Sequence, residues 1–141
     1  MMSVERVKEL GRLSVEEIFN KGNLDLISEI VSPDYVNHQA NGQDIKGVDG
    51  FRQMVVTMRT AMPDLHYTID DTITEGDKAA SRCTLTGTYS GKIGDIEVKD
   101  KKINITQAIF ARVENDKVIE GWGFTDSAVL YQQLGVSPPT S

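Results

Sequence analysis

Apolar residues in the first third of the chain recur at helical spacing among charged residues. Residues 3–21 predict a first helix, and Gly22 is placed to end it, because glycine readily adopts the backbone conformation that closes a helix. Asn23 can cap a short second helix over residues 24–31, which Pro33 would end. Two helices are therefore expected before any strand.

The clearest periodic stretch follows a short extended segment, residues 35–40, and a polar loop, residues 41–47. Apolar residues there lie at i, i+3, i+4, i+7 and i+11, which predicts a third helix with one apolar face, ended by Pro63: Phe51, Met54, Val55, Met58 and Met62. A methionine-rich stripe of this kind usually packs in a core, although methionine also lines adaptable pockets.

From residue 64 onward the pattern alternates with a period of two, which is typical of strands. Two hairpins and a closing helix are predicted. The first hairpin joins strands 65–70 and 79–89 about a turn at 75–78, and a glycine-bearing loop or short strand follows over 90–98. The second hairpin joins strands 103–113 and 118–126 about Asn115-Asp116, and the closing helix over 127–134 is ended by Gly135. Three helices followed by long antiparallel hairpins predict an α+β domain. A curved sheet around the helices would leave room for a small-molecule site.

Composition and charge fit a single soluble domain over residues 1–141, with a frayed tail at 136–141. The formal net charge of −6 disfavours binding to nucleic acid or to an anionic membrane. The single cysteine excludes an intrachain disulfide, and two histidines far apart do not suggest a metal site. Without a secretory signal or an apolar run of membrane-spanning length, a cytoplasmic protein is expected.

The last hairpin predicts the surroundings of Asp126. If Asn115 and Asp116 form a two-residue turn, one face of the sheet carries three opposed pairs: Ile109 with Trp122, Gln107 with Phe124, and Ile105 with Asp126. A carboxylate in such apolar company is suited to general acid–base chemistry. Asp126 also lies where a strand yields to a helix, where aspartate is a favoured N-cap, and a shift of one residue would place it near Asn104 and Thr106 instead.

His38 is the other candidate for proton transfer. Its neighbours of the same parity are Val36 and Ala40, so it is expected to face an apolar side, as a hydrogen-bonded core residue or as a catalytic one. No phosphate-binding glycine motif, metal-ligand spacing or nucleophile elbow is present in the sequence. The chemistry that fits these residues is proton transfer without cofactor or metal.

Several short motifs, in this order and spacing, resemble the SnoaL-like polyketide cyclase family of the nuclear transport factor 2-like superfamily. The resemblance extends over roughly residues 4–136 and rests on the following stretches: Y35-V-N-H38, G47-V-D-G-F51, G87-T-Y-S-G91, D116-K-V-I-E-G-W122, and Asp126 ahead of Y131-Q-Q-L-G135.

The resemblance implies a cone-shaped α+β fold with a deep pocket, and a homodimer. It implies intramolecular aldol cyclisation of a polyketide-like ester without cofactor or metal, with Asp126 as acid/base and His38 hydrogen-bonded to a substrate oxygen. The substrate, a small hydrophobic or polyketide-like molecule, would contact Trp122, Phe124, Met54, Met58, Tyr35, Gln107, Ile105 and Tyr89. The chain departs from the family pattern at two places. Tyr89 stands where relatives often have histidine. Cyclases of the family also tend to carry another ionisable pocket residue on the strand before the final hairpin turn, whereas residues 103–111 offer only Asn104, Thr106 and Gln107 as polar candidates.

Other functions within the same superfamily remain open. A ketosteroid isomerase needs a basic aspartate after the first short strand, for which only Asp44 is available. The limonene-type epoxide hydrolases use an Arg-x-Asp pair, whereas Arg82 is followed by Cys83 and Thr84. A non-catalytic ligand-binding or dimerising domain is the further alternative, and it predicts a small or filled pocket with Asp126 as a cap.

Overall fold

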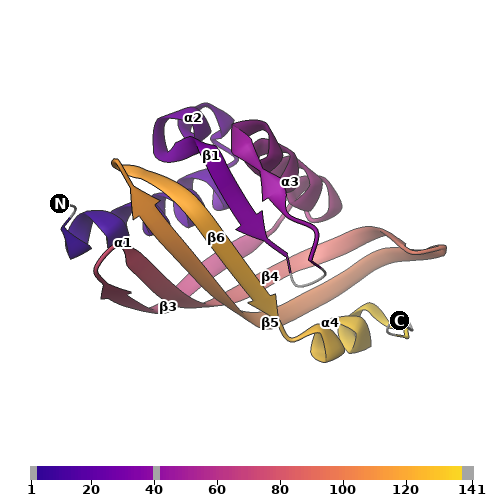
Figure 1. Ribbon diagram of the computed structural model, residues 1–141. Helices are drawn as coiled ribbons and strands as arrows, with labels where there is room; N and C mark the ends of the chain where they lie inside the picture. Colours follow the sequence, from indigo (N-terminus) through magenta and orange to yellow (C-terminus); the bar gives the residue numbers. More distant parts are fainter. Residues whose placement is uncertain (1–2, 40–41, 138–141) are drawn as a thin grey trace.

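The residues that the structure describes form one mixed sheet of six strands, with α1, α2 and α3 on one of its faces (Figure 1). The computed structural model describes residues 3–39 and 42–137. The elements follow in the order α1 (Val4–Leu13), a π-helical segment (Ser14–Asn20), a 3-10 turn (Leu24–Leu26), α2 (Ile27–Ile30), β1 (Val31–His38), β2 (Ile45–Lys46), α3 (Gly47–Ala61), β3 (His66–Glu75), β4 (Lys78–Ile93), β5 (Ile96–Glu114), β6 (Lys117–Thr125) and α4 (Ser127–Leu134). The predicted α+β fold class is confirmed.

The first predicted helix is confirmed, with a change of winding along it. Ser3 caps α1 by accepting a hydrogen bond from the Arg6 backbone N–H, and π-helical turns carry the helix on to Asn20. Gly22 follows in the left-handed conformation, with φ of 72°, as its predicted role as helix end requires. Short π-helical insertions recur at functional sites, and this one faces the sheet.

The second predicted helix ends earlier than expected. The α-helical turn stops at Ile30, and β1 begins at Val31, so Pro33 lies inside a strand instead of closing the helix. Proline has no N–H to donate, and the pairing of β1 with β6 is interrupted between Val31 and Val36. The predicted strand over 35–40 is therefore longer at its start, while Ala40 lies outside the described residues.

The strands are ordered β2-β1-β6-β5-β4-β3, with β1 parallel to β6 and every other neighbouring pair antiparallel. Both predicted hairpin turns are present. Asn115 and Asp116 adopt positive φ angles of 53° and 63°, which suits a two-residue hairpin turn. The segment 90–98 is the end of the long β4–β5 hairpin, which extends past the other strands (Figure 1).

The predicted register of the β5–β6 hairpin is wrong beyond its first two pairs. Val113 pairs with Val118, but Arg112 pairs with Glu120, so Ile119 is an extra residue in β6. Such a β-bulge shifts every later pair by one position. Phe110 now opposes Trp122 and Ala108 opposes Phe124, in place of the expected partners Ile109 and Gln107.

The closing helix α4 has the predicted bounds, with Gly135 left-handed at its end. It packs beside β5 past the end of β6, where a strand edge would otherwise be open. The Gln133 side chain accepts a hydrogen bond from the Asn104 backbone N–H (2.8 Å) and donates one to its carbonyl (3.0 Å). Of the predicted tail, residues 138–141 lie outside the described part. In the part of the chain that is described, no helix is long and apolar enough to cross a membrane.

Candidate functional site

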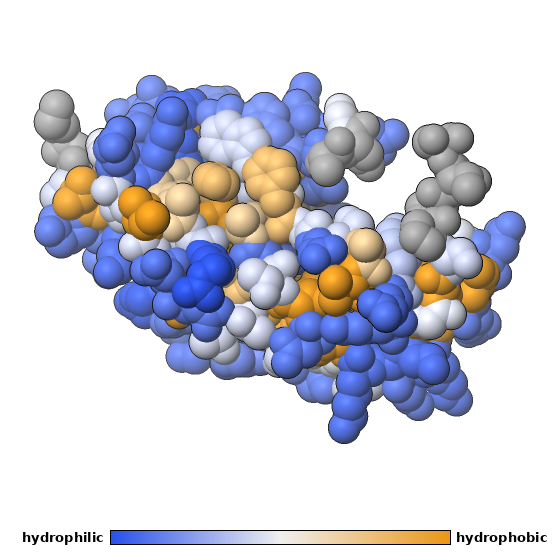
Figure 2. All heavy atoms as spheres, turned by 90° about the horizontal axis from the view of Figure 1, so that it is seen from below, coloured by the Kyte–Doolittle hydropathy of each residue, from blue (hydrophilic) through white to orange (hydrophobic). Residues whose placement is uncertain are grey.

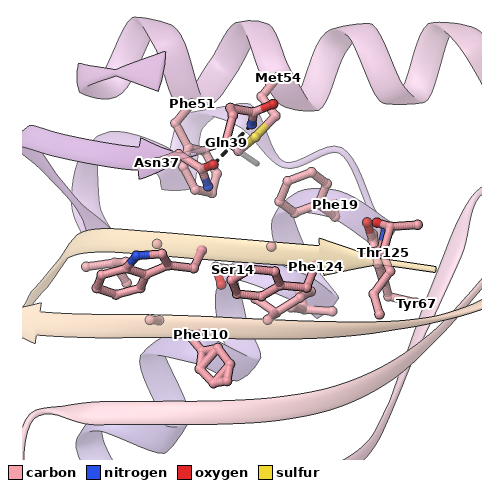
Figure 3. Close-up of a pocket in the computed structure, with 18 of the residues that line it drawn as sticks. Ser14, Phe19, Asn37, Gln39, Phe51, Met54, Tyr67, Phe110, Phe124 and Thr125 are labelled. Atoms are coloured by element: carbon pink, nitrogen blue, oxygen red, sulfur yellow. Dashed lines mark hydrogen bonds between the residues drawn. The ribbon is translucent and has the colours of Figure 1, made fainter. Parts of the chain in front are cut away.

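A cavity of about 370 Å³ lies between the helices and the face of the sheet that they cover, which we call the inner face. Helix α3, the π-helical segment and strands β1, β3, β5 and β6 all contribute to its walls (Figure 3). The lining consists of Ser14, Val15, Phe19, Tyr35, Asn37, Gln39, Phe51, Met54, Met58, Tyr67, Gln107, Ile109, Phe110, Ala111, Val118, Gly121, Trp122, Gly123, Phe124, Thr125 and Ser127. None of these lining residues is an acid, a lysine, an arginine or a histidine.

Five neutral polar side chains of the cavity form hydrogen bonds with one another. Asn37 Nδ2 donates to the Tyr35 hydroxyl oxygen (2.9 Å), and Gln39 Nε2 donates to Asn37 Oδ1 (3.1 Å; Figure 3). On the sheet, Gln107 Nε2 donates to Thr125 Oγ1 (2.7 Å). Neutral donors and acceptors placed among apolar walls are typical of sites that bind uncharged ligands.

Aromatic edges hold one wall of the cavity in place. The Phe51 ring meets Tyr35 edge-on, with centroids 5.2 Å apart, and Phe19 contacts both Phe51 (5.8 Å) and Tyr67 (5.7 Å) in the same way. Edge-to-face pairs of this kind stabilise packing beyond simple area burial. Burial raises the pKa of Tyr35 to about 12, against a smaller lowering by the hydrogen bond from Asn37, so its hydroxyl is protonated at neutral pH.

Six of the predicted substrate-contacting residues line this cavity: Met54, Met58, Tyr35, Gln107, Trp122 and Phe124. The bulge changes the face of the sheet toward which the Trp122 and Phe124 side chains point. Strand alternation points Gly121, Gly123 and Thr125 inward, and Trp122 and Phe124 toward the opposite face of the sheet. Since glycines have no side chain, the backbone of β6 itself forms this part of the cavity floor.

Two other predicted contact residues lie elsewhere. Ile105 is buried in a second apolar cluster between the sheet and α4, and Tyr89 packs against the same cluster. Neither is among the residues that line the cavity. The predicted pairing of Ile105 with Asp126 depended on the register that the bulge changes.

Asp126 follows β6 and caps α4. Its Oδ1 accepts a hydrogen bond from the Val129 backbone N–H (3.3 Å), and its side chain is exposed. The expected position opposite Ile105 on the Trp122 face is therefore wrong, because β6 ends at Thr125 and the register has shifted by one residue. Asp126 is nonetheless flanked by two cavity-lining residues, Thr125 and Ser127.

His38 lies on the face of the sheet away from the helices, which we call the outer face, and not among apolar residues as expected. Its Nε2 lies 2.6 Å from Glu120 Oε2 and its Nδ1 lies 3.4 Å from Asp44 Oδ1, while its ring stacks on Trp122. Asp44, the base required by the isomerase alternative, is thus also outside the cavity lining. His38 and Trp122 pair side by side on β1 and β6, which gives His38 the parity opposite to Tyr35 and Asn37.

A chain of charges continues across the outer face. Glu120 Oε1 accepts a hydrogen bond from Arg112 Nε (2.8 Å), so one carboxylate binds both Arg112 and His38. The hydrogen bond to Glu120 raises the pKa of His38, with a smaller contribution from the charge of Asp44. The hydrogen bond from Arg112, followed by that from His38, lowers the pKa of Glu120.

The outer face also carries an apolar patch beside these charges, shown in Figure 2. Ile73 is 70% exposed, Phe124 52% and Phe110 38%, and the two phenylalanine rings meet edge-on with centroids 5.9 Å apart. The outer-face apolar patch is formed by Ile73, Ala80, Phe110, Trp122 and Phe124. Exposed apolar patches of this kind mark binding surfaces.

Sequence reasoning missed the polar wall of the cavity formed by Asn37 and Gln39. Both share the parity of Tyr35 on β1, so the alternation that singled out His38 also placed these two residues on the opposite face. Phe51 was expected as a core residue of the third helix, and it lines the cavity as well.

Comparisons with known proteins identify the fold. IdmH from Streptomyces antibioticus, a proposed polyketide cyclase, is 25% identical over 92% of this chain and 99% of that chain, with a TM-score of 0.78. A proposed SnoaL-like polyketide cyclase from Jannaschia sp. CCS1 is 17% identical over 98% of each chain, with a TM-score of 0.86. AclR from Streptomyces galilaeus, a proposed hydroxylase, is 24% identical over 96% of this chain and all (100%) of that chain, with a TM-score of 0.80.

The comparison with curated proteins gave no match. The neighbours at 17% and 24% identity establish the fold alone, because one fold supports several chemistries. The family model of the SnoaL-like polyketide cyclases matches residues 10–134, which is most of the chain. On this match, the chain belongs to the SnoaL-like polyketide cyclase family.

Proposed function

We propose that the protein binds a neutral, mostly apolar, polyketide-like molecule in the inner-face cavity. The supporting observation is a cavity of about 370 Å³ whose lining residues, within the described part of the chain, are all apolar or neutral polar. Ligand sites are commonly about 300–1,000 Å³ in volume. A charged ligand would lose its hydration there without meeting an opposite charge, which is costly.

A matched pair of aromatic probes tests this proposal. 2-Acetylnaphthalene is neutral, whereas 2-naphthoate has a similar shape and carries a negative charge. We expect the neutral probe to bind at least about tenfold more tightly, because the anion has no partner for its charge. Equal or tighter binding of the anion, measured by fluorescence titration, would contradict the proposal.

Two substitutions on one helix then locate the bound probe. Met54→Trp fills the cavity from α3 and should abolish binding, whereas Val56→Trp adds the same bulk at an exposed position of that helix and should leave binding unchanged. Loss of binding in both variants, or in neither, would argue against the inner-face cavity as the site.

We further propose that Asp126 is the base of a cofactor-free aldol cyclisation at the edge of this cavity. Asp126 is flanked by the lining residues Thr125 and Ser127, and its carboxylate is exposed and accepts one long hydrogen bond. The carboxylate would take a C–H proton that lies between two carbonyl groups. The resulting enolate carbon would attack a second carbonyl carbon of the same molecule, forming a C–C bond, and the proton would return from Asp126 to the new alkoxide.

Different substitutions of Asp126 separate its role as helix cap from its proposed role as base. Asparagine caps helices about as well as aspartate but is no base, so Asp126→Asn should keep the fold while lowering turnover of a β-dicarbonyl ester about a hundredfold or more. Asp126→Ala removes both roles and should also cost about 1 kcal/mol of unfolding free energy. Equal turnover by wild type and Asp126→Asn would remove the proposed catalytic role and leave the cap.

We also propose that two copies of the chain associate through the outer-face apolar patch. Symmetric pairing would cover Ile73, Phe110 and Phe124, which are exposed in the single chain. Most soluble homo-oligomers are two-fold dimers in which one surface meets itself.

A further inference from the structure

Three alternate residues of β1 and its continuation present a row of polar groups to the cavity. Tyr35, Asn37 and Gln39 all line it, and each donates to or accepts from the next. Figure 3 shows Asn37 and Gln39 close to Phe51 and Met54, on the α3 side of the cavity. These residues lie on a strand and bond to each other, so a ligand would meet groups already fixed in position.

The hydrogen bonds of this row leave the Tyr35 hydroxyl proton uncommitted. Gln39 donates to Asn37 Oδ1, so the Asn37 amide nitrogen is the group turned toward Tyr35. Asn37 Nδ2 donates into the Tyr35 hydroxyl oxygen at 2.9 Å, which leaves the hydroxyl proton available for another acceptor. Across residues 3–39 and 42–137, Asn37 is the only group that hydrogen-bonds this hydroxyl.

The position of the hydroxyl oxygen is tightly determined. The Tyr35 ring is 3% exposed and is held edge-on by Phe51 at 5.2 Å. Gly121 lies close to the hydroxyl, because an added Cβ there would sit 2.6 Å from Tyr35 Oη and 3.3 Å from Asn37 Nδ2. Glycine at 121 thus leaves the space that the hydroxyl occupies, and the sheet holds the oxygen at the cavity wall.

We propose that Tyr35 Oη is the hydrogen-bond donor that binds a carbonyl oxygen of the ligand, with Asn37 as the positioning residue that directs its proton. This inference rests on the proposed binding of a neutral polyketide-like molecule in the cavity, and it names the group that recognises it. The ligand class is a ketone or ester whose carbonyl reaches the β1 wall. If that carbonyl enolises, the same donor stabilises the enolate oxygen, since donors fixed in advance act most strongly on developing charge.

Burial keeps Tyr35 in the donor form. Because burial raises its pKa to about 12, the hydroxyl stays protonated throughout the neutral range. Tyr89 lies outside the cavity lining, so removal of its hydroxyl provides a matched control.

Two isosteric ligands isolate the carbonyl contribution. 2-Acetylnaphthalene and 2-isopropenylnaphthalene differ only in an oxygen that replaces a CH₂ group. Wild-type protein should bind the ketone more tightly than the alkene. Tyr35→Phe should weaken ketone binding about three- to tenfold and leave alkene binding unchanged, as expected for loss of one hydrogen bond. Asn37→Ala should reduce the ketone preference less, and Tyr89→Phe, which removes a hydroxyl outside the cavity lining, should retain it.

The outcomes separate this inference from the cavity proposal. Binding of neither ligand to wild type would overturn the cavity function and this inference with it. Binding of both, with the same ketone preference in Tyr35→Phe as in wild type, would overturn the role of Tyr35 alone. Thermal unfolding of each variant checks that the fold is intact.

A measurement on wild-type protein covers the case in which Tyr35→Phe does not fold. The carbonyl of bound ¹³C-labelled 2-acetylnaphthalene is followed by isotope-edited infrared spectroscopy. We expect a carbonyl stretch lower than in an apolar aprotic solvent, in wild type and in Tyr89→Phe alike. A band at the apolar-solvent position would show that no donor reaches the carbonyl, and would overturn the inference.

Discussion

The two faces of β6 differ in chemistry although they come from the same nine residues. Inward, Gly121, Gly123 and Thr125 meet a neutral cavity. Outward, Glu120 joins Arg112 and His38 in a charged chain, and Trp122 and Phe124 join the exposed patch. Ionisable groups thus gather on the face without the cavity, and the face with the cavity relies on uncharged hydrogen bonds.

Desolvation explains why the groups divide in this way. An ionised side chain inside an apolar cavity loses hydration unless a partner replaces it. On the outer face, Glu120 has two cationic or protonatable partners and remains partly solvated. A family member that carries its ionisable groups outside the cavity is expected to bind through neutral donors, and to recruit any base from the rim.

The largest expected effect concerns the outer face. Phe110→Asp combined with Phe124→Asp would place like charges against each other in a symmetric dimer, and should weaken self-association more than about a hundredfold. Sedimentation velocity over a range of concentrations measures this. Ile96→Asp, at an equally exposed apolar position near the tip of the β4–β5 hairpin, is the matched control and should leave association unchanged. A wild-type protein that stays monomeric at high concentration would contradict the proposal.

The next effect concerns the inner face of the same strand. Gly121→Ala would set a methyl group 2.6 Å from the buried Tyr35 hydroxyl, and should cost about 1–3 kcal/mol of unfolding free energy. Gly123→Ala meets no atom within 4 Å and should change stability by less than about 1 kcal/mol. Urea denaturation compares the two variants. Similar stabilities would mean that the Tyr35 hydroxyl is not closely confined.

A smaller effect probes the charged chain. Glu120→Gln should lower the pKa of His38 toward its ordinary value, because the hydrogen bond to Glu120 is the main cause of its rise. Asp44→Asn should lower the pKa of His38 less, since Asp44 lies at 3.4 Å and Glu120 at 2.6 Å. NMR titration of the imidazole signals, assigned with His38→Gln, measures both. Glu120→Gln should also leave binding of 2-acetylnaphthalene in the cavity unchanged, and a large change would show that the two faces are coupled.

Local signals in the sequence predicted the elements well, because those signals act over a few residues. Gly22 and Gly135 end their helices in the left-handed conformation, and Asn115-Asp116 forms its hairpin turn. The helical spacing of Met54 and Met58 predicted one wall of the cavity. In each case the residue type itself favours the conformation found.

The candidate site was predicted less well because it depends on parity over a longer distance. A single extra residue, Ile119, exchanges the two faces for the rest of β6. Ile119 is not a glycine, so nothing in the residue type marks the bulge. The same dependence on parity drew attention to His38 and away from Asn37, its neighbour on the cavity side.

The smallest expected effect is the pH dependence that the charged chain adds to stability. The pKa of His38 is raised in the folded protein, so its contribution is fully present below the unfolded value of 6.5 and is lost as pH rises through the folded value. The pKa of Glu120 is lowered from 4.5, so its contribution is present above 4.5 and is lost as pH falls. Together these directions place the greatest stabilisation between about pH 5 and 6.5.

Comparison of wild type with His38→Gln tests this pH window. The difference in urea midpoint should be larger at pH 5.5 than at pH 8.5, because deprotonation of His38 removes the charge that Glu120 and Asp44 favour. His66→Gln is the control, because His66 forms no ion pair with any residue in the described part of the chain, so this variant loses a histidine without losing an ion pair. Because the pair is partly solvated, salt should reduce the difference at pH 5.5. A difference that is equal at both pH values would mean that His38 is held by its stacking on Trp122 and not by the two carboxylates.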